Sequence, residues 1–126
     1  MNQKRKGSAG ERELADILRN HGIRAYRNDQ IYKSGKGNPD VAAEIAGIPL
    51  HIEVKRVEKL NVSEAVNQAV RDAAEDALPV VAHRRNREHW LLTAPLVPIL
   101  DILKEKGAIE PDPFIRDLIM EQEEQM

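Results

Sequence analysis

The sequence predicts one α/β domain in which a central mixed β-sheet is flanked by helices, in the order α-β-β-β-α-β-β-α. Three observations lead to this prediction. Residues 48–55 alternate between apolar and other side chains, which is typical of a strand. Two segments that open at Ser8 and at Asn61 join a helix-capping pattern to apolar residues at helical spacing. The length of 126 residues suits one domain that buries about two thirds of the surface of its unfolded chain.

The first helix is predicted to open with the capping box Ser8-Ala9-Gly10-Glu11 and to run to about His21, where Gly22 stops it. Residues 1–7 are basic and are expected to precede the helix. The Glu11 side chain falls close to the apolar face of this helix. The pattern alone favours a capping role for Glu11, and a role in a functional site is the alternative.

The next elements are predicted to be strands. Residues 23–27 form a short strand, and residues 28–38 form a polar, basic loop. Residues 41–46 and 48–55 then form two strands joined at Ala46-Gly47. This pair is the predicted hairpin.

The hairpin gathers charged side chains at one end. If the turn has two residues, Ile45 pairs with Ile48, and counting outward places Asp40 opposite Glu53. Glu53 and Lys55 share a face of their strand. Like charges placed opposite each other destabilise a sheet, so the arrangement indicates a cation between the two carboxylates. Mg²⁺ takes oxygen ligands from one or two carboxylates plus substrate phosphate, which predicts a phosphodiesterase site in outline.

The second half of the chain supplies the remaining elements. A second capping box at Asn61-Val62-Ser63-Glu64 opens a helix that is predicted to reach about Ala77, with an apolar face rich in alanine. Two strands are predicted next, over residues 78–84 and 88–93. A helix over residues 95–106 follows and is predicted to bury Leu96, Ile99, Leu100 and Leu103. A last helix is predicted to begin at Asp112.

Composition narrows the class of protein. The absence of cysteine excludes disulfides and thiolate metal sites and fits a reducing cytoplasm. The four histidines lack paired ligand spacing, which argues against zinc. No apolar run is long enough to span a bilayer, so we expect a soluble, cytoplasmic protein that does not bind membranes.

The net charge of −2 is unevenly spread. Residues 110–126 hold six acids and one base, whereas residues 1–109 hold 18 bases and 15 acids, a balance of +3. We therefore expect a mildly basic domain over residues 1–109, followed by an acidic C-terminal extension over residues 110–126. Such a body permits nucleic acid as a partner.

The densest basic cluster lies at the tip between the last two predicted strands. It contains Arg84, Arg85 and Arg87, with His83 and Trp90 beside them. The functional interpretation is an edge that contacts DNA phosphates, since backbone contacts supply much of the affinity in DNA binding. An ordinary polar hairpin tip is the alternative.

The order of elements and the placement of the acids resemble the PD-(D/E)xK nuclease superfamily, and within it the archaeal-type Holliday junction resolvases and their phage relatives. The matching motifs are Lys6-Gly7-Ser8-Ala9-x-Glu11-Arg12, Pro39-Asp40 and Ile52-Glu53-Val54-Lys55. The resemblance spans residues 4–93 and implies a restriction-endonuclease-like fold.

The resemblance also implies roles for the matching residues. Asp40 and Glu53 would bind Mg²⁺, for which Mn²⁺ can substitute, and the Val54 carbonyl would be a further ligand. Lys55 would position the attacking water and help to deprotonate it. Glu11 would reach the metal directly or through water.

Further residues are expected to contact DNA. The family often has a glutamine on the helix after Glu-x-Lys, for which Gln68 is the candidate, although it lies off the apolar stripe, where a plain surface role is the alternative. Ser34 could match a loop serine that contacts substrate. The expected DNA contacts are Lys4, Arg5, Lys6, Ser34, Lys36, Gln68, Arg84, Arg85 and Arg87.

The predicted function is a Mg²⁺-dependent endonuclease that binds branched DNA as a homodimer and resolves four-way junctions by paired nicks. Another nuclease of the same fold, acting in restriction, repair or on flaps, is the first alternative. A non-catalytic DNA-binding protein, in which the charged hairpin is only a solvated face, is the second.

Overall fold

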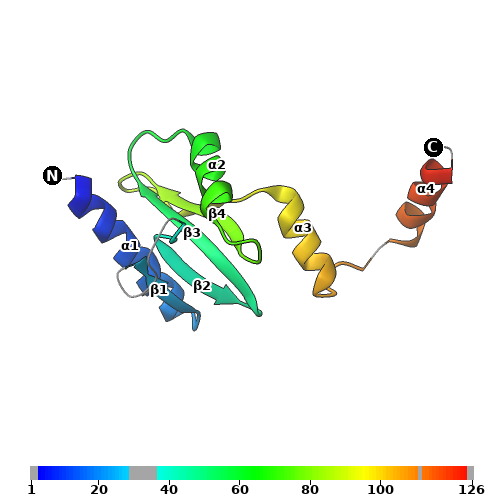
Figure 1. The fold of residues 1–126 in the computed structure, drawn as a ribbon, viewed down its shortest axis with the longest axis horizontal. Helices are drawn as coiled ribbons and strands as arrows, with labels where there is room; N and C mark the ends of the chain where they lie inside the picture. Colours follow the sequence, from blue (N-terminus) through cyan, green and yellow to red (C-terminus); the bar gives the residue numbers. More distant parts are fainter. Residues whose placement is uncertain (1–2, 29–36, 111, 125–126) are drawn as a thin grey trace. The chain divides into compact units, whose positions relative to one another are not determined.

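The computed structural model describes residues 3–28, 37–110 and 112–124, and gives the backbone alone for residues 3–6. Helices and strands follow the predicted order, with the last helix expected from Asp112 also present (Figure 1). The elements are α1 (Gln3–Asn20), β1 (Arg24–Arg27), β2 (Val41–Ile45), β3 (Ile48–Arg56), α2 (Val62–Asp72), β4 (Leu78–Arg84), β5 (Leu91–Thr93), α3 (Leu96–Glu105) and α4 (Pro113–Glu124).

The five strands form one sheet in the order β1-β2-β3-β4-β5. Strands β3 and β4 are parallel, and the other neighbours are antiparallel, so the predicted mixed sheet is confirmed. Antiparallel neighbours need only short turns, whereas the parallel pair needs a crossover, which α2 provides. Since the sheet follows chain order, β3 lies at its centre.

The two faces of the sheet are covered by different helices. Leu14 of α1 packs with Ile52 and Val54 in the larger apolar cluster. On the other face, Ala65 and Ala69 of α2 pack against Val81 of β4 in a smaller cluster. Side chains alternate along a strand, so the residues of β3 between the apolar ones point toward the α2 face. Figure 1 shows α1 and α2 on the two sides of the strands.

Helix α1 begins earlier than the sequence predicted. It starts at Gln3, so Ser8 and Glu11 are internal to the helix and the predicted capping box is wrong. Gln, Lys and Arg are good helix formers, which explains how residues 3–6 extend the helix. The predicted stop is confirmed, because Gly22 adopts φ 81° and the Ile23 N–H donates to the Leu18 carbonyl at 3.0 Å.

Helix α2 begins as predicted and ends early. The Asn61 side chain accepts a hydrogen bond from the Glu64 N–H at 3.1 Å, which confirms the cap. The helix stops at Asp72, five residues before the predicted end, and Ala73 is extended. Acidic side chains at Glu75 and Asp76 would face the negative end of a longer helix, which disfavours its continuation.

The chain divides into two units, Met1–Pro95 and Leu96–Met126. The second unit holds α3 and α4, and α4 is capped by Asp112, whose Oδ1 accepts from the Phe114 N–H at 2.9 Å. The predicted burial of Leu96, Leu100 and Leu103 is wrong, because all three are exposed; the fourth, Ile99, is half-buried. Amphipathic spacing identifies an apolar face but does not supply the surface that covers it.

Among the described helices, none combines the length and apolar character that a membrane span requires.

Candidate active site

The turn between β2 and β3 decides which residues meet at the other end of the hairpin. Ala46 and Gly47 both have positive φ, 52° and 78°, as a two-residue type I′ turn requires. The turn pairs Ile45 with Ile48, and the same register pairs Val41 with Ile52. One step further along the ladder, Asp40 lies opposite Glu53, as predicted.

Asp40 and Glu53 lie close enough that each carboxyl group shifts the pKa of the other. A hydrogen bond fixes Asp40, since the Val54 N–H donates to its Oδ2 at 2.9 Å. Burial, followed by the charges of Glu53 and Glu11, raises the pKa of Asp40 to about 7. Asp40 therefore keeps its proton up to about pH 7.

Glu53 titrates in the opposite direction. Burial works to raise the pKa of Glu53, but the hydrogen bond from His51, the nearby Asp40 carboxyl group and the charges of His51 and Lys55 hold it below its ordinary value. Glu53 is 4% exposed, so these interactions act in a setting with little water. The two environments thus favour a proton on Asp40 and an ionised Glu53 below about pH 7.

His51 is a site residue that the sequence analysis missed. Its Nε2 lies 2.8 Å from Glu53 Oε1, and the His51 residue is 3% exposed. The available signal was the position two residues before Glu53, on the same face of the strand. Alternation predicts the shared face, but it does not predict the side-chain rotamers that join the two groups.

Lys55 is half-buried on β3, on the face that carries Glu53. Its charge lowers the pKa of Glu53, so the two side chains interact as predicted. The parallel ladder places His83 of β4 beside Lys55, and the His83 ring contacts Thr93 Oγ1 at 2.8 Å. Burial lowers the pKa of His83.

Glu11 reaches the edge of this group from α1. It lies close enough to raise the pKa of Asp40, and its Oε2 lies 3.8 Å from Arg27 Nη2. The same arginine nitrogen donates to Ser8 Oγ at 2.8 Å. Ser8 and Glu11 therefore link α1 to β1 instead of capping the helix.

Comparison with known proteins identifies the family. The profile of the family described as archaeal Holliday junction resolvase (Hjc) matches residues 2–106. The chain belongs to this family. No curated protein sequence matched the chain. A solved structure is also similar, that of Hjc from Archaeoglobus fulgidus, a Holliday junction resolvase from an archaeal hyperthermophile. The two share 29% identity, with a TM-score of 0.56, over 70% of this chain and 76% of that one.

Hjc proteins are nucleases and generally depend on divalent metals. Asp40 and Glu53 fit such a metal, because they place two carboxyl groups close together where the charge of Glu53 disfavours ionisation of Asp40 and a bound cation would favour it. Within the described residues, no three His, Asp or Glu side chains gather closely enough to hold a metal ion together. Glu11 thus does not join the pair as a third direct ligand in this arrangement.

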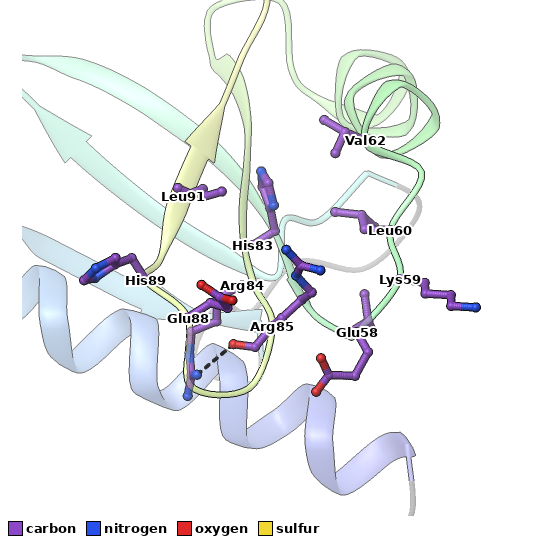
Figure 2. Close-up of a pocket in the computed structure, with 11 residues that line it drawn as sticks. Glu58, Lys59, Leu60, Val62, His83, Arg84, Arg85, Glu88, His89 and Leu91 are labelled. Carbon is purple, nitrogen blue, oxygen red and sulfur yellow. Dashed lines mark hydrogen bonds between the residues drawn. The ribbon is translucent and has the colours of Figure 1, made fainter.

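The turn between β4 and β5 carries Arg85 and Arg87, directly after Arg84 at the end of β4, and is called the basic tip. It lies beside a surface pocket (Figure 2). The pocket lies between the segment that follows β3 and the β4–β5 hairpin, and Lys59, His83 and Arg85 line it. Arg85 and Arg87 are exposed. Their exposure leaves both guanidinium groups accessible, and DNA contact by them stays a prediction.

Arg84, predicted to contact DNA, has a partner within the chain, Glu13. Its Nε and Nη2 donate to the two Glu13 carboxylate oxygens at 2.9 and 3.1 Å, and Trp90 Nε1 donates to Glu13 Oε1 at 2.8 Å. The Arg84 guanidinium also lies 5.6 Å from the centre of the Trp90 ring. These contacts tie α1 to the β4–β5 hairpin, a structural role that was assigned to neither Glu13 nor Arg84 from sequence.

Other predicted DNA contacts fall in different places. Gln68 is half-buried on α2, next to the buried Ala69. Ser34 and Lys36 lie outside the described residues, as do the side chains of Lys4, Arg5 and Lys6. Val54, whose carbonyl was predicted as a metal ligand, donates its N–H to Asp40 Oδ2.

Proposed function

We propose that the chain is a Mg²⁺-dependent endonuclease that resolves four-way DNA junctions by paired nicks, with Asp40, Glu53 and Lys55 at each cutting site. The proposal is supported above all by the position of Asp40 opposite Glu53, close enough for the charge of Glu53 to raise the pKa of Asp40, with Lys55 on the same face of the sheet as Glu53. Family membership supports the choice of DNA junctions as the substrate.

The metal would be held mainly by Asp40 and Glu53. Their oxygens suit Mg²⁺, which prefers a small number of carboxylates and keeps several waters, and Mn²⁺ can substitute. The Val54 carbonyl would be a further ligand, and Glu11 would act through water. Bound Mg²⁺ supplies positive charge that favours ionisation of water and stabilises the transferring phosphate.

Lys55 would act on the attacking water and on the phosphate. Its ammonium group orients the water by a hydrogen bond, and its charge favours loss of the water's proton. The same charge stabilises the negative charge that develops in the transition state. Attack by this water on the phosphorus, with the 3′ oxygen as the leaving group, would give 5′-phosphate and 3′-hydroxyl ends.

DNA would be held by basic side chains around the site. Arg85 and Arg87 are exposed at the β4–β5 tip and suit phosphate contacts. Lys4, Arg5, Lys6, Ser34, Lys36 and Gln68 stay in this proposal as predicted contacts. Arg84 would support the tip through Glu13 instead of binding DNA.

Two copies of the chain would be needed, because resolution requires a nick in each of two opposed strands. Apolar side chains on α3 and α4 are exposed and suit a second copy, among them Leu96, Leu100, Phe114 and Leu118. We propose residues 1–109 as the nuclease domain, which fits the family match over residues 2–106, and residues 110–126 as an acidic extension.

A panel of synthetic substrates tests the substrate class. The purified chain is incubated with a four-way junction, a flap and a linear duplex of the same sequences, with Mg²⁺ or with EDTA. We expect Mg²⁺-dependent cutting of the junction at symmetrically placed positions, with much slower cutting of the other two. Faster cutting of the flap or the duplex would point to another nuclease of the same fold. No cutting of any substrate would point to a binding protein.

A further inference from the structure

His51 binds Glu53 from two residues earlier on the same strand, β3. Both residues are almost fully buried, at 3% and 4% exposed, and His51 Nε2 lies 2.8 Å from Glu53 Oε1. The ladder places Ala42 and Pro79 on either side of His51, neither of which has a polar side chain. The His51 ring thus has a carboxylate in front of it and small or apolar neighbours at its flanks.

The direction of this hydrogen bond follows from the chemistry of the two groups. A carboxylate can only accept hydrogen bonds, so the His51 ring donates through Nε2. Asp40 is fixed in a comparable way, by the Val54 N–H at 2.9 Å. Each of the two carboxyl groups proposed to bind metal is therefore held by one donor from β3.

Such donors matter because metal sites need their ligands in place before the ion binds. A glutamate side chain has several rotamers, and holding one of them costs conformational entropy that a hydrogen bond offsets. Groups that orient metal ligands typically change metal affinity by about 10- to 100-fold when they are removed.

We propose that His51 is a positioning residue that holds the Glu53 carboxylate in the orientation needed to bind the divalent metal. The proposal rests on the metal-binding role proposed for Glu53. His51 itself touches neither the metal nor the DNA. It acts by restricting Glu53, and any donor of similar reach at this position should serve.

Mn²⁺ binding without DNA tests this, measured by calorimetry on the full chain. His51→Leu keeps a buried apolar volume and removes the donor, and we expect it to weaken Mn²⁺ binding by about tenfold or more. His51→Gln offers an amide N–H, and its affinity should stay within about threefold of wild type. The matched control is His83→Leu, which removes a partly buried histidine from the same face without touching Glu53, and its Mn²⁺ affinity should be unchanged.

A second readout separates positioning from a general loss of structure. The Mn²⁺ concentration that gives half-maximal junction cleavage should rise at least tenfold in His51→Leu, while the rate at saturating Mn²⁺ should return close to that of wild type. If His51→Leu does not unfold cooperatively, His51→Met gives the same comparison with a more adaptable side chain.

Two results would overturn the proposal. One is wild-type Mn²⁺ affinity in a folded His51→Leu or His51→Met chain. The other is a loss in His51→Gln as large as that in His51→Leu. The variant Glu53→Gln distinguishes failure of this proposal from failure of the proposed function. If Glu53→Gln binds Mn²⁺ like wild type, the ligand role of Glu53 is wrong. If Glu53→Gln loses Mn²⁺ binding while His51→Leu binds normally, only the positioning role of His51 is wrong.

Discussion

Asp40, directly before β2, lies opposite Glu53 of β3, and the charge of Glu53 helps to raise the pKa of Asp40 to about 7. The chain thus keeps two acids close together at a partly buried position, where ionising both costs free energy unless a cation is bound. This pair links the stability of the fold, its response to pH and its proposed chemistry.

The metal-free protein should lose stability as the pH rises from about 5 to 8. An unfolded aspartate releases its proton near pH 4, whereas Asp40 in the folded chain keeps it until about pH 7. Between these values the folded state holds more protons, so the free energy of unfolding falls as the pH rises. We expect a fall of about 2 kcal/mol in urea denaturation with EDTA. Asp40→Asn should remove this fall, and an equal fall in that variant would contradict the assignment.

Metal binding should tighten over the same pH range. Asp40 must release its proton before it can bind a cation, and with a pKa of about 7 it is mostly protonated at pH 6 and mostly ionised at pH 8. Calorimetry should therefore show Mn²⁺ binding about tenfold tighter at pH 8 than at pH 6. Equal affinity at the two pH values would show that Asp40 does not limit binding.

Glu13 should stabilise the packing of α1 against the β4–β5 hairpin. Burial works to raise the pKa of Glu13, but hydrogen bonds from Arg84 and Trp90 keep it below its usual value. Glu13→Ala removes the acceptor of three hydrogen bonds and should cost about 1 to 2 kcal/mol of unfolding free energy. Trp90 is the only tryptophan, so its fluorescence should change with the variant.

The control for Glu13 is a surface ion pair. Asp16 lies 3.8 Å from Arg19 on the exposed side of α1, and Asp16→Ala should change the unfolding free energy by less than about 0.5 kcal/mol. If Glu13→Ala and Asp16→Ala lower the unfolding free energy by the same amount, the Glu13 contacts stabilise the fold no more than a surface ion pair does.

The arginines of the basic tip should separate into two classes. Arg85→Ala and Arg87→Ala should each weaken binding of the DNA junction and leave the melting temperature unchanged. Each should also reduce the slope of the logarithm of the binding constant against the logarithm of salt concentration by about one. Arg84→Ala should lower the melting temperature, because it breaks the bidentate contact with Glu13. Melting curves and binding at several salt concentrations check this division, and the reverse pattern would contradict it.

The hairpin was predictable because its register depends on a local signal. Ala46-Gly47 admits a two-residue turn, and a period of two along each strand then fixes every opposing pair as far as Asp40 and Glu53. Lys55 follows from the same alternation. The family motifs coincide with these positions, so sequence and structure agree on the centre of the site.

Features that depend on competition or on rotamers were not predictable in this way. Ser8 and Glu11 have the spacing of a capping box, but the preceding helix formers extend α1 and leave both residues to contact Arg27. The contacts of His51 with Glu53 and of Arg84 with Glu13 need rotamers and an inter-element distance that no periodic pattern contains. The exposure of α3 likewise depends on what surface is available to cover it.

Cleavage of a synthetic four-way junction by Asp40→Asn, measured beside its binding of the same junction, tests the central claim most directly. The account predicts that the variant binds the junction with an affinity close to that of wild type and makes no nicks in Mg²⁺, while the wild-type chain cuts it in paired positions. Nicking by Asp40→Asn at the wild-type rate would contradict the account, because the proposed metal site would then play no part in the reaction.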